Sequence, residues 1–117
     1  MPQLIAEHSK DVTTRNAIPA LFSALMTVCE ATDIIAAENV KLRAHGYPSY
    51  LVGGEMRPFL HLTLIILTGR SDPQKAELAD KLIGAADKAM PDDVEITLDI
   101  RDSDVKCFRK RPPQKTD

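Results

Sequence analysis

Large aromatic residues, cysteines and long apolar runs are scarce in this sequence. Its 117 residues include three Phe, two Tyr, no Trp and two Cys. Leu, Ile, Val and Ala must therefore build the core, because aromatic anchors can supply little of it. No apolar run approaches the roughly 20 residues that cross a bilayer, and the first residues lack the basic and apolar parts of a signal peptide. We expect a cytoplasmic protein that makes no membrane contact.

The charge is nearly balanced, which argues against a nucleic-acid partner. The formal net charge is -2 at pH 7, and phosphate attraction needs clustered positive charge. Hydrophobic residues make up 44% and charged residues 27%, values typical of a globular chain. This length suits a single core, so we predict one domain over residues 1–111 and a solvated tail over residues 112–117.

The two cysteines do not indicate a metal site. Neither Cys29 nor Cys107 has a second Cys or His at zinc-finger spacing. We interpret both as reduced thiols, whose roles the sequence leaves open, and expect no bound metal.

Apolar periodicity in the first half predicts a strand, a helix and a second strand. Residues 3–7 form a short, partly alternating run, and residues 18–29 place apolar side chains at three- and four-residue spacing. Asn16 is the predicted cap of that helix, with Pro19 in its first turn. In residues 40–45, Val40, Leu42 and Ala44 alternate with basic residues, so Lys41, Arg43 and His45 share the polar face of the second strand.

The second half repeats this order. Residues 46–58 are rich in Gly and Pro and predict a loop, whereas residues 59–67 read as a central strand covered on both faces. Ser71 or Asp72 starts a helix that ends before Pro91, and residues 94–101 alternate strictly as a fourth strand.

The predicted order is β-α-β-β-α-β, an α+β subunit of two layers. Each helix is long enough to cross between parallel strands, which gives two β-α-β units with both helices on one face of the sheet. The other face is then bare, although the central strand is apolar on both sides. Association of copies through the sheet would cover that face.

Pro2 is the first candidate for chemistry. Removal of Met1 would leave a secondary amine at the chain end, and burial beside cations would lower its pKa toward neutrality. Such an amine can act as a general base. A proline at position two is also common without any function, so the residue gains meaning only from its surroundings.

Arg43, Arg70 and His45 are the candidate substrate-binding residues. Arginine grips carboxylates through two parallel hydrogen bonds and stabilises an enolate oxygen, which suits a dicarboxylate substrate. His45 could orient substrate or donate a proton. By themselves, the two arginines are more often solvated surface residues and a histidine such as His45 is more often a buried structural one, and Ser71 is adequately explained as a helix cap.

Five short segments carry a resemblance to a known family. They are MPQLIAEHS at the start, Ile-Pro-Ala-Leu-Phe at 18–22, Lys-Leu-Arg-Ala-His at 41–45, Leu-His-Leu-Thr-Leu at 60–64 and Gly-Arg-Ser at 69–71. With these segments in register, the chain resembles the 5-carboxymethyl-2-hydroxymuconate isomerases of the tautomerase superfamily. The segment between His45 and His61 looks short for that family, and the chain matches loosely from Asp102 onward.

The resemblance implies a tautomerase-like homotrimer that needs no metal or organic cofactor. It implies an isomerase that shifts a double bond in an unsaturated 2-hydroxy or 2-oxo dicarboxylate during homoprotocatechuate degradation, a branch of aromatic compound catabolism. Pro2 would be the base, and Arg43 and Arg70 would hold carboxylate or enolate oxygens. Two alternatives stay open: a tautomerase for another 2-oxo acid, and a trimeric binding protein of the same fold without activity.

Overall fold

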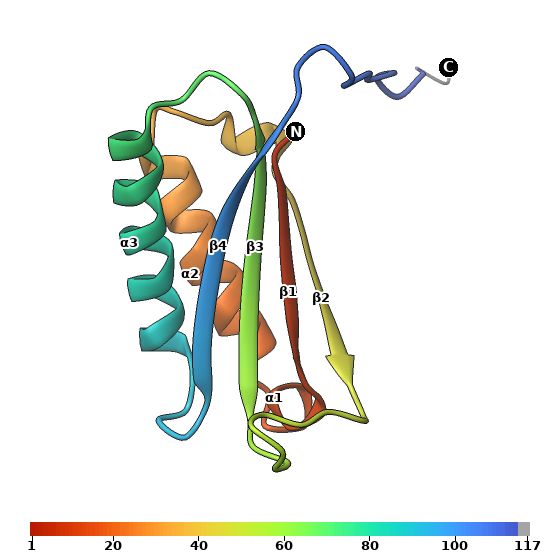
Figure 1. Cartoon of the computed structure of the whole chain (residues 1–117), viewed down its shortest axis with the longest axis vertical. Helices are drawn as coiled ribbons and strands as arrows, with labels where there is room; N and C mark the ends of the chain where they lie inside the picture. The colour runs from red at the N-terminus through yellow and green to blue at the C-terminus, as the bar shows by residue number, and fades with distance from the viewer. Residues whose placement is uncertain (115–117) are drawn as a thin grey trace.

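Four strands form one sheet, and the two long helices cover one of its faces. The computed structural model describes residues 1–114. Along the chain the elements are β1 (Gln3–Ser9), α1 (Lys10–Thr14), α2 (Ile18–Ala31), the 3-10 helix η1 (Ala37–Asn39), β2 (Lys41–Tyr47), β3 (Phe59–Leu67), α3 (Asp72–Ala89) and β4 (Glu95–Ser103). Figure 1 shows α2 and α3 packed on the same side of the sheet. It also shows α1 at the end of the sheet opposite the N-terminus.

The strand order is β2-β1-β3-β4. β1 runs parallel to β2, β3 runs parallel to β4, and the central pair β1 and β3 is antiparallel. Each parallel pair is joined through one long helix, as parallel strands require a crossover connection. The predicted α+β architecture of two β-α-β units is therefore confirmed.

The core lies between the sheet and the two long helices. Alternate residues of β3 point into it, because successive side chains of a strand face opposite sides. On that face Leu60, Leu62 and Leu64 are fully buried, and Ile66 is 1% exposed. Opposite them, the helices contribute the following buried residues: Leu21, Leu25 and Cys29 from α2, and Leu78, Leu82 and Ala86 from α3.

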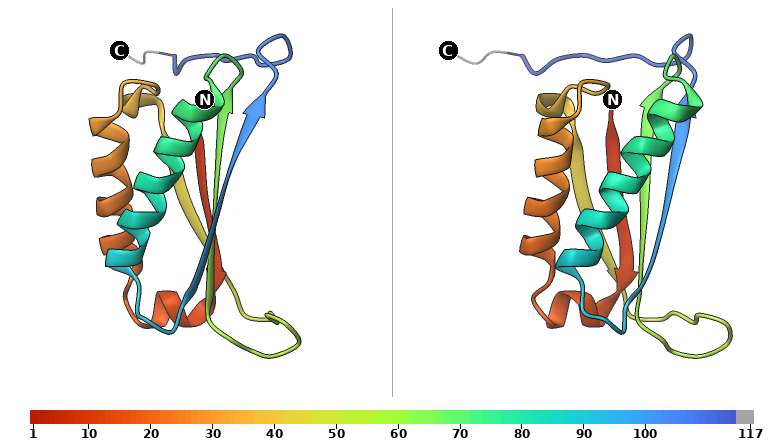
Figure 2. Two further views of the ribbon diagram at one scale, coloured as in Figure 1. Left: turned by 60° about the vertical axis from the view of Figure 1, so that its left-hand side comes forward. Right: turned by 90° about the vertical axis from the view of Figure 1, so that its left-hand side faces the viewer.

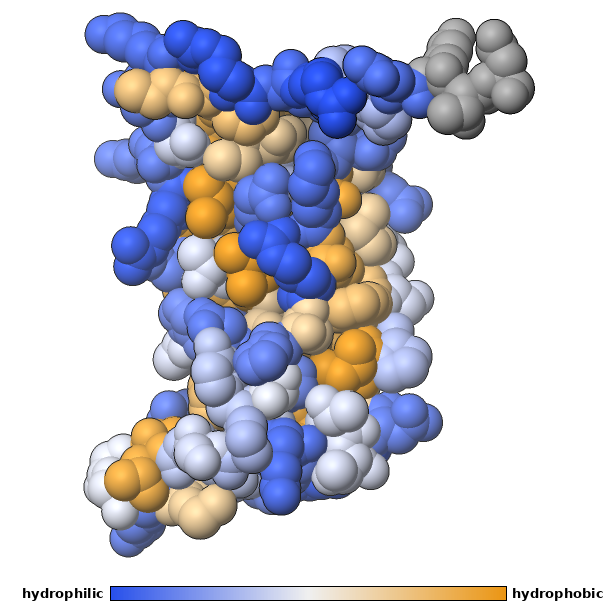
Figure 3. Space-filling view, turned by 90° about the vertical axis from the view of Figure 1, so that its right-hand side faces the viewer, coloured by the Kyte–Doolittle hydropathy of each residue, from blue (hydrophilic) through white to orange (hydrophobic). Residues whose placement is uncertain are grey.

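The other face of the sheet, called the bare face below, carries neither long helix. Phe59, Ile65 and Leu67 of β3 are only half-buried there, and Figure 3 shows apolar side chains interleaved with hydrophilic ones across this face. His61 and Thr63 interrupt the apolar row, and His61 Nδ1 lies 2.7 Å from the Thr97 hydroxyl. The prediction that β3 is apolar on both faces therefore holds fully only for the face under the helices.

The structure corrects the start of the first long helix. Asn16 does not cap α2, whose N-cap is Ala17, without a side-chain hydrogen bond. Instead Asn16 follows α1, a short helix that the sequence did not predict, and adopts a φ of 58°. The amides of Asn16 and Ala17 donate to the carbonyls of Thr13 (2.9 Å) and Val12 (3.1 Å). This is the Schellman pattern, in which Asn tolerates the left-handed conformation that ends a helix.

The start of α3 is the one that the sequence indicated. Ser71, and not Asp72, is the N-cap, and Pro73 lies in the first turn. The Ser71 hydroxyl accepts a hydrogen bond from the Gln74 amide, while the Gln74 side chain accepts one from the Ser71 amide. This reciprocal capping box satisfies two amides that the helix itself leaves unpaired.

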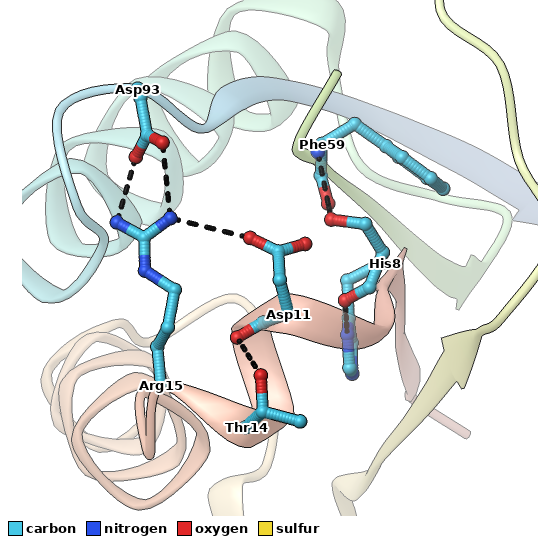
Figure 4. Close-up of polar contacts among 7 residues, drawn as sticks. His8, Asp11, Thr14, Arg15, Phe59 and Asp93 are labelled. Atoms are coloured by element: carbon cyan, nitrogen blue, oxygen red, sulfur yellow. Dashed lines mark hydrogen bonds and ion pairs between the residues drawn. The ribbon is translucent and has the colours of Figure 1, made fainter. Parts of the chain in front are cut away.

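Polar contacts hold the end of the sheet near α1 (Figure 4). Arg15 reaches from the end of α1 to Asp93, with nitrogen–oxygen distances of 2.8 and 3.0 Å. Hydrogen bonding from Arg15 holds the pKa of the Asp93 carboxyl below its ordinary value. The Ser9 hydroxyl accepts from the Phe59 amide at 3.1 Å, tying β1 to β3. These hydrogen bonds and ion pairs thus hold together the end of the molecule that lies far from the N-terminus.

Within residues 1–114, no helix is long and apolar enough to cross a membrane. The predicted tail over residues 112–117 falls partly outside the described residues. Its described part, residues 112–114, is exposed and contains neither helix nor strand.

Candidate functional site

Pro2 lies buried at the end of the sheet where β1 begins. Its carbonyl accepts a hydrogen bond from the Lys41 amide at 3.1 Å, which ties the chain end to the start of β2. Beside it is a small cavity of about 170 Å³, called the N-terminal cavity below. Its lining consists of Met1, Pro2, Ala36, Asn39, Ile66, Leu67 and Arg70. The cavity is therefore formed by the ends of β1 and β3 together with η1.

Arg70 is fixed in the wall of this cavity. Its Nε donates to the Ile34 carbonyl at 2.8 Å, and its Nη1 donates to the Leu67 carbonyl at 3.1 Å. Directly before Arg70, Gly69 turns the chain with a φ of 130°. Residues other than glycine rarely adopt this conformation. Within residues 1–114, Nη2 forms no hydrogen bond to the protein.

Two lysines lie close to the amine at the cavity end of the molecule. The terminal amine of Met1 has a pKa below its ordinary value, mainly because burial disfavours the charged form and further because Lys41 and Lys110 lie nearby. Lys41 Nζ lies 3.5 Å from the Asn39 carbonyl, and Lys110 Nζ lies 3.4 Å from Asn39 Oδ1. Cations of this kind favour a neutral, basic amine and an anionic ligand.

Two of the predicted substrate-binding residues, Arg43 and His45, do not line this cavity. The register of β1 and β2 pairs Arg43 with Ile5 and His45 with Glu7, so both side chains project from the bare face. Arg43 Nη1 donates to Gln3 Oε1 at 2.6 Å, and the His45 ring meets Tyr47 edge-on with 4.9 Å between centroids. One chain therefore brings Pro2 and Arg70 together, but not Arg43 or His45.

Other polar residues of the first two strands have structural partners. Tyr47 donates its hydroxyl to Glu7 at 2.6 Å, and this hydrogen bond raises the pKa of Tyr47. His8 is 1% exposed on the helix-covered face, with its Nδ1 2.8 Å from the Ser9 carbonyl. Glu7 and His8 thus point to opposite faces and do not form an acid–base pair. Ser71 acts as a helix cap.

Asn39 and Lys110 are the members of this site that sequence reasoning missed. Asn39 belongs to a short 3-10 helix with no buried residue, so no apolar period marks it. Lys110 follows β4 in a basic segment that reads as a solvated end of the chain. Strand alternation predicted that Lys41 lies on the polar face of the second strand, but nothing in the sequence indicated that it lies close to Pro2.

A larger cavity than this one lies elsewhere in the described structure. A groove of about 590 Å³ lies between α2 and α3 and is lined largely by small residues, including Ala24, Ala31, Gly84 and Ala85. Its charged residues are Asp80, Lys81 and Lys88. Size alone therefore does not identify the chemistry, and the smaller cavity with a buried Pro2 and a fixed Arg70 is the better candidate.

A metal-dependent site finds no support in the described residues. Across residues 1–114, no three His, Cys, Asp or Glu side chains cluster in a way that would hold an ion. Cys29 is buried and Cys107 is exposed, both as free thiols, and burial raises the pKa of Cys29. The chemistry available at the N-terminal cavity is that of an amine beside a guanidinium.

Known proteins resemble this chain throughout its length. A family model described as 5-carboxymethyl-2-hydroxymuconate isomerase matches residues 2–107. No curated protein sequence matches it significantly. A 5-carboxymethyl-2-hydroxymuconate isomerase from Deinococcus radiodurans R1 is 24% identical, with a TM-score of 0.83 over 96% of this chain and 90% of that one.

Two further solved structures show the same fold. A 5-carboxymethyl-2-hydroxymuconate delta-isomerase is 19% identical, with a TM-score of 0.74 over 100% of this chain and 95% of the other. A fused 4-OT symmetric trimer is also 19% identical, with a TM-score of 0.70 over 86% of this chain and 85% of the other. The tautomerase fold and a family match over nearly all of the sequence show that this chain belongs to the 5-carboxymethyl-2-hydroxymuconate isomerase family.

Proposed function

We propose that this isomerase uses the amine of Pro2, freed by removal of Met1, as its general base. The proposed substrate is an unsaturated 2-hydroxy or 2-oxo dicarboxylate, with 5-carboxymethyl-2-hydroxymuconate, an intermediate of homoprotocatechuate degradation, as the best single candidate. One observation carries the proposal: Pro2 and Arg70 line the same cavity, with Lys41 and Lys110 close to the chain end.

The reaction needs one base, one site for negative charge and no net change in atoms. The neutral prolyl nitrogen takes a proton from the substrate, and the electron pair moves into the conjugated system as a dienolate. The Arg70 guanidinium stabilises the oxygen on which that charge develops. The protonated proline then returns the proton to a different carbon, which moves the double bond. These steps use only the terminal amine and the Arg70 side chain, so the proposal includes no cofactor.

An assay over a panel of substrates tests this function. The panel contains 5-carboxymethyl-2-hydroxymuconate and several enols of 2-oxo monoacids and diacids, and ultraviolet absorbance follows loss of the conjugated enol. Fast turnover of the muconate supports the named substrate. A preference for another compound favours the alternative of a tautomerase for a different 2-oxo acid. Binding of the dicarboxylate without turnover, in protein shown to lack Met1, favours the non-catalytic binding protein.

We further propose that the active form is a homotrimer. The bare face supports this, because Phe59, Ile65 and Leu67 are half-buried there and the two long helices cover only the opposite face. Solved relatives of this fold are described as trimers. In such an assembly Arg43 and His45, which project from the bare face, could meet a neighbouring copy. Their role in substrate binding remains a proposal that depends on the oligomer.

Sedimentation velocity at micromolar concentration checks the assembly. We expect one species with three times the 12.9 kDa mass of a single chain. Replacing Ile65 with aspartate should shift the distribution toward the monomer, because the charge would be buried against a neighbour. The matched control is Ile83→Asp. Ile83 lies on α3, on the helix side of the sheet, and is 36% exposed, so this change should leave the trimer intact. A wild-type monomer would contradict the proposal.

A further inference from the structure

The segment that follows β4 crosses the cavity end of the molecule. Figure 2 shows it leaving the end of β4 and running over the end of the sheet at which the N-terminus lies, toward the side of η1. Within this segment Lys110 extends to Asn39, with 3.4 Å between Nζ and Oδ1. Asn39 lines the N-terminal cavity together with Pro2 and Arg70. A residue more than a hundred positions from Pro2 in sequence is thus brought to the edge of the same site.

The charge around this cavity is unbalanced. No acidic residue lines it. Across residues 1–114, neither Arg70 nor Lys110 takes part in an ion pair, whereas Lys75 and Lys81 do. The contact of Lys110 with Asn39 is a long hydrogen bond to a neutral amide, which leaves the ammonium free to bind an anion. Within residues 1–114, the charges of Arg70 and Lys110 are therefore not neutralised by an ion pair.

Arg109, the basic residue next to Lys110, forms its hydrogen bonds away from the cavity. Arg109 Nη1 donates to the carbonyls of Lys106 (2.9 Å) and Phe108 (2.8 Å), both within its own segment. Of these two adjacent basic residues, the described structure brings only Lys110 into contact with a residue of the cavity. The charge of Lys110 also contributes to the lowered pKa of the terminal amine, which is consistent with its position beside the chain end.

We propose that Lys110 is a specificity-determining residue that binds the substrate carboxylate remote from the reacting carbon. Arg70 in the wall of the cavity then holds the oxygen beside the reacting carbon, and Lys110 at its edge holds the far carboxylate. Two cations at separate places on the cavity suit a dicarboxylate better than a monocarboxylate. This inference rests on the proposed function and adds to it the means by which a diacid is selected.

The test compares Lys110→Gln with Arg109→Gln, which removes a neighbouring charge that does not contact the cavity. Each variant is assayed with the dicarboxylate and with its analogue lacking the remote carboxylate. For Lys110→Gln, assayed at a pH at which the prolyl amine is neutral in every variant, we expect KM for the dicarboxylate to rise about 10-fold with kcat nearly unchanged, because an exposed hydrogen-bonded charge contact is lost. KM for the monocarboxylate should not change. Lys110→Arg should restore most of the dicarboxylate preference, and Arg109→Gln should behave as wild type.

Several outcomes would overturn the assignment. Equal loss on both substrates would show a structural role for the segment, and an unchanged KM for Lys110→Gln would show a solvated lysine. Calorimetric titration with a saturated, unreactive dicarboxylate gives a readout that is independent of turnover, and here too Lys110→Gln should bind about 10-fold more weakly. If wild-type protein binds that diacid but turns over no substrate, the proposed function fails. If wild type is active and Lys110→Gln is normal in both assays, the Lys110 assignment alone fails.

Discussion

Protein in which Pro2 is not the first residue is expected to be nearly inactive while folding normally. An alanine inserted between Met1 and Pro2 leaves the proline nitrogen in an amide, which is not basic, whether or not Met1 is removed. Loss of a positioned general base lowers turnover by about 10²- to 10⁴-fold. Mass spectrometry establishes the first residue of each protein, and circular dichroism and sedimentation establish fold and assembly.

Replacing Pro2 with alanine is the matched comparison. After removal of Met1 this variant carries a primary amine in nearly the same place, so we expect partial activity rather than complete loss. Full activity in a protein that verifiably retains a residue before Pro2 would exclude the proline as the base. In that case His45 would be the next candidate, and its position on the bare face would require a site formed with another copy.

The same amine predicts the pH profile. Its neutral form is the base, so kcat/KM should rise with pH through the pKa of the prolyl amine and then level off. Burial, Lys41 and Lys110 lower the pKa of the terminal amine at Met1, and we expect the same causes to act on Pro2 once it is the first residue. The midpoint of the rise should therefore lie below the ordinary range of an α-amino group, about 7.7 to 8.0. A kcat/KM that does not rise with pH at any point below that range would contradict the mechanism.

Replacing Arg70 with alanine should produce the second large loss of activity. A positioned donor to developing negative charge contributes about 2 to 4 kcal/mol to transition-state stabilisation, which corresponds to a loss of roughly 30- to 900-fold in kcat/KM. The variant should also lose some stability, because the carbonyls of Ile34 and Leu67 lose their partners. Steady-state kinetics and urea denaturation separate the two effects.

Two further arginines make this experiment specific. Arg57→Ala is the control, because its side chain also donates to a backbone carbonyl, that of Val52, but lies in the loop at the opposite end of the sheet. Its kinetics should stay close to wild type. Arg43→Ala should weaken turnover only if the bare face of one copy contributes to a site in the trimer. Near-wild-type kinetics in both Arg43→Ala and Arg70→Ala would show that these residues are ordinary surface charges.

Local sequence determined most of the secondary structure. The strict alternation in residues 94–101 predicts a strand with one covered face, and β4 (Glu95–Ser103) lies there. The apolar run over residues 59–67 matches β3 (Phe59–Leu67) in full. Ser71 and Gln74 start α3 through contacts three residues apart, so the signal is contained in the local sequence. Helix α1 was missed for the complementary reason: it has five residues and buries only Val12, too little to create a period.

The sequence also determined that Pro2, Arg43, Arg70 and His45 were the residues to examine, because their chemistry suits proton transfer and carboxylate binding. Which of them meet was decided by the tertiary structure. Pro2 and Arg70 come together because antiparallel pairing of β1 with β3 places the start of one strand beside the end of the other. Strand alternation sends Arg43 to the opposite face. Lys110 joins them through long-range packing, which no local pattern encodes because its partner Asn39 lies in a different part of the chain.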